Sequence, residues 1–180
     1  MPPVANLRDP SQTAPVTNYE ITLLFNHVYW MRDQVLKAAG NVPEVLIEQA
    51  PATIRDLRTT LVHELDVEWS WRERLRGIPF EHWGPDGELK AADYPTLGSI
   101  RHHWQEDEKV MRSWLETLDD ETLNAPWEVE KPGGRPLWQH LMHLYTHALQ
   151  QLSDAAVILS KADSSPGELD FLEFLERKGQ

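Results

Sequence analysis

Four long segments of this chain carry apolar residues at helical spacing, and none of them contains proline or glycine beyond its first turn. They predict helices over residues 18–39, about 53–76, 96–118 and 136–160, with a short helix around residues 170–177 at the end. Long amphipathic helices bury their apolar stripes by packing against one another. The chain is therefore predicted to be all-α, a four-helix bundle.

Proline and glycine mark the connections between these helices. Six of them fall within residues 77–95, which are predicted to form a long loop. Within residues 124–136, Trp127 and Val129 alternate with polar residues before a Pro-Gly-Gly turn. This pattern predicts a small β-hairpin before the last long helix. Residues 1–17 have little apolar content and predict a flexible N-terminal arm, so the bundle domain is expected to span residues 18–180.

Two of the predicted helices have recognisable first turns. Thr53 with Asp56 three residues later is similar to a capping box, so the second helix is predicted to begin at Thr53. Pro136 is expected in the first turn of the last long helix, where its missing N–H costs nothing.

The composition limits the classes of function. With 180 residues the chain fits one domain, and 29 acidic against 17 basic side chains give a net charge of −12 with histidine neutral. This charge repels phosphate backbones, so we expect no nucleic-acid binding. No apolar run is long enough to span a membrane, and the first residues do not resemble a secretory signal, so a soluble cytoplasmic protein is expected. The chain has no cysteine, which excludes disulfides and a thiol nucleophile of its own.

The first predicted helix has a second apolar stripe beside the one expected to face the core. This stripe consists of Tyr19, Leu23, His27 and Trp30. A helix that is apolar on two faces is buried by more than one neighbour or lies at a subunit interface. We therefore expect a homodimer that pairs through this stripe.

The last long helix carries a column of polar side chains on the flank next to its apolar side, namely His140, His143, His147, Gln151 and Asp154. His143 and His147 are one turn apart, close enough to chelate a single metal ion. A third ligand must come from another helix, and the second helix offers His63, which lies among small residues. Spacing alone leaves two alternatives open, a metal site and a set of surface or core histidines.

The other histidines and the tryptophans have simpler interpretations. His102 and His103 lie among acidic residues, which favours a solvated face over a second metal pair. His27 and His82 have no partner that the sequence identifies. Large aromatic side chains within helices mostly fill a core, and this interpretation applies to Trp30, Trp69, Trp71, Trp104, Trp114 and Trp138.

Three segments share their order and spacing with one known family. They are LVHELDVEWSWRERL at residues 61–75, RPLWQHLMHLYTH at residues 135–147 and SPGELDF at residues 165–171. Over about residues 19–175 the chain resembles the DinB/YfiT-like superfamily, metal-binding four-helix bundles that include thiol-dependent S-transferases and mycothiol-dependent enzymes. The superfamily is named for a damage-inducible gene and is unrelated to the DNA polymerase of that name, so DNA repair does not follow.

The resemblance implies an open metal site with three histidine ligands, one from the second helix and two from the last long helix. These ligand positions fall on His63, on His147 and on position 151, where this chain has Gln151. His143, one turn before His147, is the alternative third ligand. We therefore hypothesise a divalent ion, zinc or nickel, held by His63, His143 and His147, and the competing ligand set replaces His143 with Gln151.

Three protein ligands and an open position make a catalytic arrangement, in which the ion lowers the pKa of a bound water or thiol. Because the chain has no cysteine, a thiol nucleophile would be a low-molecular-weight co-substrate. The resemblance thus implies a metal-dependent thiol S-transferase, or a related hydrolase, acting on a small-molecule substrate. Glu64, Asp66 and Asp154 are candidates to orient a ligand or to act as a base. The alternative is a non-catalytic bundle with a degraded metal site, serving as a binding or dimerisation module.

Overall fold

The computed structural model describes residues 14–42, 53–79, 87–127 and 134–178, except for the side chain of Lys178. These ranges contain the helices α1 (Asn18–Ala39), α2 (Leu57–Leu75), α3 (Leu97–Leu115), α4 (Asp120–Asn124), α5 (Leu137–Lys161) and α6 (Phe171–Lys178), together with a 3₁₀ turn, η5 (Ala91–Asp93). The predicted all-α class is confirmed, as is the short C-terminal helix. Within the described ranges, no helix is long and apolar enough to cross a membrane.

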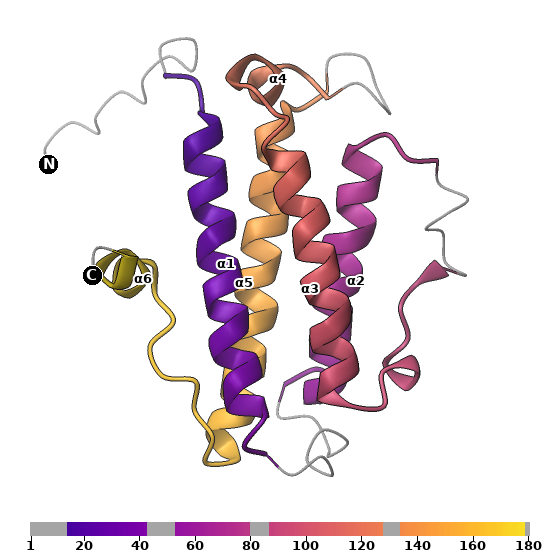
Figure 1. Ribbon diagram of the computed structural model, residues 1–180, viewed down its shortest axis with the longest axis vertical. Helices are drawn as coiled ribbons and strands as arrows, with labels where there is room; N and C mark the ends of the chain where they lie inside the picture. The colour runs from indigo at the N-terminus through magenta and orange to yellow at the C-terminus, as the bar shows by residue number, and fades with distance from the viewer. Residues whose placement is uncertain (1–13, 43–52, 80–86, 128–133, 179–180) are drawn as a thin grey trace, which may run out of the picture.

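The four long helices form the predicted bundle (Figure 1). Both α5 and α3 pack against α1 and α2. In Figure 1, α1 and α5 run in one direction and α2 and α3 run in the other. The side chain of Asn18, at the start of α1, accordingly donates to the carbonyl of Leu115 at the end of α3, at 2.7 Å. This arrangement places the histidine-bearing α5 directly beside α2.

The start of α2 differs from the prediction. Asp56, with an extended backbone, is the N-cap residue, and its carboxylate accepts a hydrogen bond from the Thr59 N–H at 2.8 Å. Thr53 lies before the helix, and its hydroxyl donates to the carbonyl of Arg55 at 3.3 Å. A carboxylate at the cap also interacts favourably with the positive end of the helix dipole. Pro136 likewise caps α5 from outside instead of occupying its first turn.

Replacement of the capping residue tests this assignment. Asp56→Ala is expected to lower the free energy of unfolding by about 1 kcal/mol, because the Thr59 N–H loses its acceptor. The matched change Thr53→Ala should stay within about 0.5 kcal/mol of the wild type. Urea denaturation followed by circular dichroism measures both effects. A larger loss at Thr53 than at Asp56 would show that the helix starts where the sequence pattern placed it.

The connection before α5 contains the base of the predicted hairpin. Pro126 and Pro136 form an isolated antiparallel β-bridge, and the Trp127 N–H donates to the carbonyl of Arg135 at 2.9 Å. The rest of the predicted hairpin, at residues 128–133, lies outside the described residues, as do residues 1–13 of the predicted arm. The limits of the arm and of the domain stay predictions.

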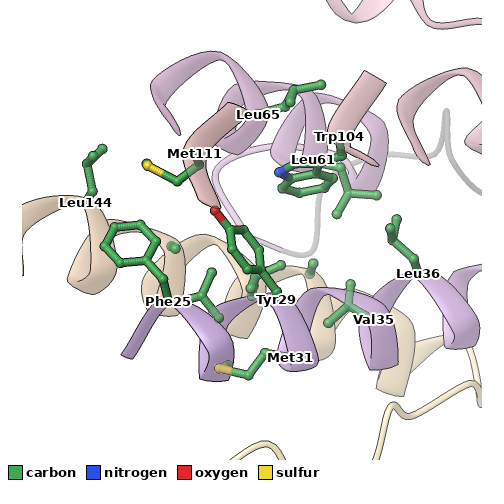
Figure 2. Packing of buried hydrophobic residues seen from close by; sticks show 14 of the residues in the cluster. Phe25, Tyr29, Met31, Val35, Leu36, Leu61, Leu65, Trp104, Met111 and Leu144 are labelled. Carbon is green, nitrogen blue, oxygen red and sulfur yellow. The ribbon is translucent and has the colours of Figure 1, made fainter. Parts of the chain in front are cut away.

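The core of the bundle packs Tyr29 and Trp104 among apolar side chains (Figure 2), and both aromatic residues also hydrogen-bond a buried carboxylate. The hydroxyl of Tyr29 on α1 donates to one carboxylate oxygen of Glu68 on α2 at 2.7 Å, and the indole N–H of Trp104 on α3 donates to the other at 3.0 Å. All three side chains are buried. Arg72 on α2 and Asp107 on α3 form a buried ion pair beside this cluster of hydrogen bonds. Hydrogen bonds and charge pairs therefore fix how α1, α2 and α3 meet.

Part of the second apolar stripe of α1 is covered within the chain, since α6 and the segment before it pack on His27 and Trp30, whereas Tyr19 is 73% exposed. His27 is buried, and its ring lies 5.3 Å from that of Phe171 and 5.4 Å from that of Phe174, measured between centroids. Its Nε2–H donates to the carbonyl of Leu169 at 3.0 Å, so Nδ1 of the neutral ring accepts from the hydroxyl of Tyr145 at 3.2 Å. The part of the stripe around His27 thus has a partner in the same chain, and the homodimer stays a prediction.

Candidate functional site

The packing of α5 against α2 brings two of the candidate ligands together. His63 on α2 faces His147 on α5, with their ring centroids 5.2 Å apart. Both side chains are half-buried, so each ring is supported by the bundle and still reaches its surface. The two helices run in opposite directions and hold these rings on rigid backbone, which suits a site that must keep its geometry.

A buried carboxyl group holds the His147 ring from the interior. Oε2 of Glu64 lies 2.6 Å from Nδ1 of His147. Burial, and then the positive charges of His63, His143 and Arg55, lower the pKa of His147 to about 4. Burial, and then the negative charge of Glu68, raise the pKa of Glu64 well above its usual range. The contact is therefore a hydrogen bond involving a neutral imidazole, and Nε2 is the nitrogen left for another partner.

The charge state of His147 gives a direct test of this environment. In the metal-free protein, His147 is expected to stay neutral as the pH falls from 7 to 5, because its pKa lies at about 4. A long-range ¹H–¹⁵N correlation spectrum, with histidine ring nitrogens assigned through His147→Ala, would follow the titration. A His147 that becomes charged near the ordinary histidine pKa of about 6.5 would contradict the buried, uncharged environment.

Gln151 lies one turn beyond His147 on α5 and is buried, with 3% of its surface exposed. Its side-chain oxygen Oε1 has no hydrogen-bond partner among the described residues. Leaving a buried acceptor unsatisfied costs about 1–3 kcal/mol, so such an atom marks a place where a partner is expected.

His143 occupies a different position from the other candidate ligands. Its side chain is exposed, and its ring lies 6.3 Å from that of His147 and 5.1 Å from that of Trp71, measured between centroids. Across the part of the chain that the structure describes, no three His, Cys, Asp or Glu side chains come together as a group that could hold a metal ion. The third metal ligand of the hypothesised site would therefore be Gln151, or His143 after a movement of its side chain.

An aromatic surface continues from this site toward the start of α5. His140 lies with its ring centroid 5.0 Å from Trp127 and 6.3 Å from Trp71, and the guanidinium of Arg74 stacks on the Trp71 ring at 5.0 Å. The sequence pattern assigned Trp71 to core packing, yet its ring is only half-buried and borders the candidate site. Its contacts with His140 and His143 depend on how α2 packs against α5, which the sequence pattern does not show.

The remaining sequence candidates lie elsewhere or take other roles. Asp66 accepts a hydrogen bond from the Leu89 N–H at 2.8 Å and so anchors the segment before η5. Asp154 is half-buried on α5. His102 is exposed, and His103 hydrogen-bonds the hydroxyl of Tyr94 at 2.6 Å, while His82 lies outside the described residues. Of the three carboxylates considered as orienting groups, Glu64 is the one in contact with His147.

The donor set formed by these residues fits a divalent metal ion. Two imidazoles face each other, one of them is neutral and held from behind by a carboxyl group, and a buried amide oxygen without a partner lies one turn away. Imidazole nitrogen is a good ligand for zinc and nickel, and the amide oxygen would add one neutral oxygen ligand to the two nitrogen ligands.

The fold is a bundle of four long helices in which His63 on α2 faces His147 on α5. A sequence model of the DinB family matches residues 14–178, so the chain belongs to the DinB family. It is 24% identical over 153 residues to a Bacillus subtilis (strain 168) protein named "Uncharacterized protein YizA", an alignment that covers 82% of this chain and 91% of that protein.

Proposed function

We propose that the chain binds one divalent metal ion between α2 and α5 and acts as a metal-dependent enzyme on a small-molecule substrate. The observation that carries this proposal is the buried, partnerless Oε1 of Gln151, one helical turn along α5 from His147, whose ring faces that of His63. A cation held by the two imidazoles would give that oxygen a partner. Membership of the DinB family supports the same location.

In this proposal His63, His147 and Gln151 are the protein ligands, and His143 is the alternative to Gln151. Burial favours Gln151, because its side chain is buried and its oxygen lacks a partner among the described residues, whereas His143 is exposed and its ring packs on Trp71. A bound zinc or nickel ion lowers the pKa of a coordinated water or thiol, so that a nucleophile is available near neutral pH.

The chain's own residues would bind and orient the reactants. Glu64 holds the His147 ring, and the half-buried Trp71 offers an aromatic surface beside the exposed His143. Because the chain has no cysteine, a thiol nucleophile would be a small-molecule co-substrate. We therefore place thiol S-transfer before hydrolysis as the reaction class.

Metal analysis of protein purified without chelator tests the proposal, followed by titration of the metal-free protein with Zn²⁺. One ion per chain is expected. His143→Ala should bind Zn²⁺ like the wild type, whereas Gln151→Leu should bind roughly tenfold more weakly, about 1.4 kcal/mol. The reverse pattern would assign the third position to His143.

The second candidate function is a non-catalytic binding module with a degraded metal site. It is favoured by the amide at position 151 and by the lack of a three-ligand His, Cys, Asp or Glu group in the described ranges. A wild-type chain that neither carries metal nor binds Zn²⁺ would decide in its favour.

A further inference from the structure

Glu64 and His63 are neighbours in the sequence, and both meet the ring of His147 on α5, at different depths in the bundle. His63 is half-buried at the candidate site, whereas the Glu64 side chain points into the bundle and is 3% exposed. From there its Oε2 reaches Nδ1 of His147 on α5, at 2.6 Å. An imidazole has two nitrogens, so engagement of Nδ1 leaves Nε2 for a ligand and fixes the plane of the ring.

Within the described ranges, His147 is the hydrogen-bond partner of the Glu64 side chain, whereas the buried Arg72 pairs with Asp107 and Glu73.

One turn further along α2, Glu68 adds a second buried carboxyl group, which accepts hydrogen bonds from Tyr29 and Trp104. Glu68 therefore offers a comparison within the same helix, because it is also buried but has no histidine among its hydrogen-bond partners in the described residues.

We propose that Glu64 is a positioning residue, which fixes the orientation of the His147 ring for the metal. This inference rests on the proposed metal site. It is carried by the 2.6 Å contact between Oε2 of Glu64 and Nδ1 of His147, which leaves Nε2 of the same ring for the metal.

Substitution by glutamine tests the positioning role. Glu64→Gln keeps the size of the side chain and a polar group that can hydrogen-bond Nδ1 of His147, but an amide holds the ring of a metal ligand less strongly than a carboxylate does. In the metal-free protein the variant should be about as stable as the wild type, because the shape and the hydrogen bond are kept. In the presence of Zn²⁺ it should bind the ion about 10–100-fold more weakly, the range typical of residues that support a metal ligand.

Glu68→Gln is the matched control, since Glu68 is also buried on α2 but hydrogen-bonds Tyr29 and Trp104 instead of a histidine. The experiment measures the thermal midpoint and the Zn²⁺ affinity of the full chain for the wild type and both variants. Glu68→Gln should lower the midpoint of the metal-free protein and leave Zn²⁺ affinity unchanged. Glu64→Gln should show the opposite combination, with a smaller rise of the midpoint on addition of Zn²⁺.

The possible results separate this inference from the proposed function. Wild-type Zn²⁺ affinity in Glu64→Gln would overturn the positioning role while leaving the metal site in place. A variant that loses metal-free stability, and loses Zn²⁺ affinity only to the extent that Glu68→Gln does, would show a purely structural role and would also overturn it. If the wild-type chain binds no Zn²⁺, the proposed function fails, and this inference fails with it.

Discussion

His147→Ala is expected to weaken Zn²⁺ binding by more than about 100-fold, because loss of a ligand should exceed the 10–100-fold cost of losing a group that only supports one. His147 faces His63 across the α2–α5 contact and is held by Glu64 from within the bundle. Alanine is a strong helix former, so α5 should keep its helical structure. Isothermal titration of the metal-free protein measures the affinity, and circular dichroism checks the fold.

His140→Ala is the control, because His140 belongs to the same histidine column but contacts Trp71 and Trp127. It should bind Zn²⁺ as the wild type does. If His147→Ala also binds Zn²⁺ normally, the proposed location of the metal site between α2 and α5 is wrong.

The converse change, Gln151→His, restores the residue that the family pattern implies at this position. It should tighten Zn²⁺ binding at least about tenfold, since imidazole is the better ligand for zinc.

The helices of this fold could be predicted from the sequence because their information is local. Each long helix shows its apolar stripe at helical spacing, and the observed bounds agree with the predicted ones to within a few residues. The contact of His63 with His147 could be proposed because family resemblance placed the two positions in one site. The start of α2 was misplaced because Thr53 and Asp56 are both good capping residues, and the choice depends on where the chain enters the bundle.

Features that depend on packing between distant segments could not be predicted. Whether Glu64, Asp66 or Asp154 supports a ligand depends on the rotation of α2 against α5, and a helical wheel of one segment does not contain that rotation. The stripe around His27 suggested a dimer, because nothing local shows that Phe171 and Phe174 return to cover it. Helical periodicity identifies an apolar face, but it does not show which segment or which second chain packs on that face.

The second large effect is expected in the core, at Trp104. This side chain is 1% exposed, and its indole N–H donates to Glu68 at 3.0 Å. Truncation of a buried tryptophan to alanine costs about 3–5 kcal/mol through lost burial and a residual cavity. The lost donor leaves one oxygen of Glu68 unsatisfied, which adds about 1–3 kcal/mol. Trp104→Ala should therefore lower the free energy of unfolding by about 5 kcal/mol.

Trp104→Phe separates the two contributions, because it keeps most of the ring and removes the N–H. It should cost about 1–3 kcal/mol, mainly from the unsatisfied Glu68 oxygen. Since domains are typically stable by about 5–15 kcal/mol, the alanine variant should be close to unfolding at room temperature, whereas the phenylalanine variant should remain folded. Urea denaturation curves of the two variants measure both values. Equal losses would place the whole effect in the hydrogen bond to Glu68, and a negligible loss for Trp104→Phe would place it in packing alone.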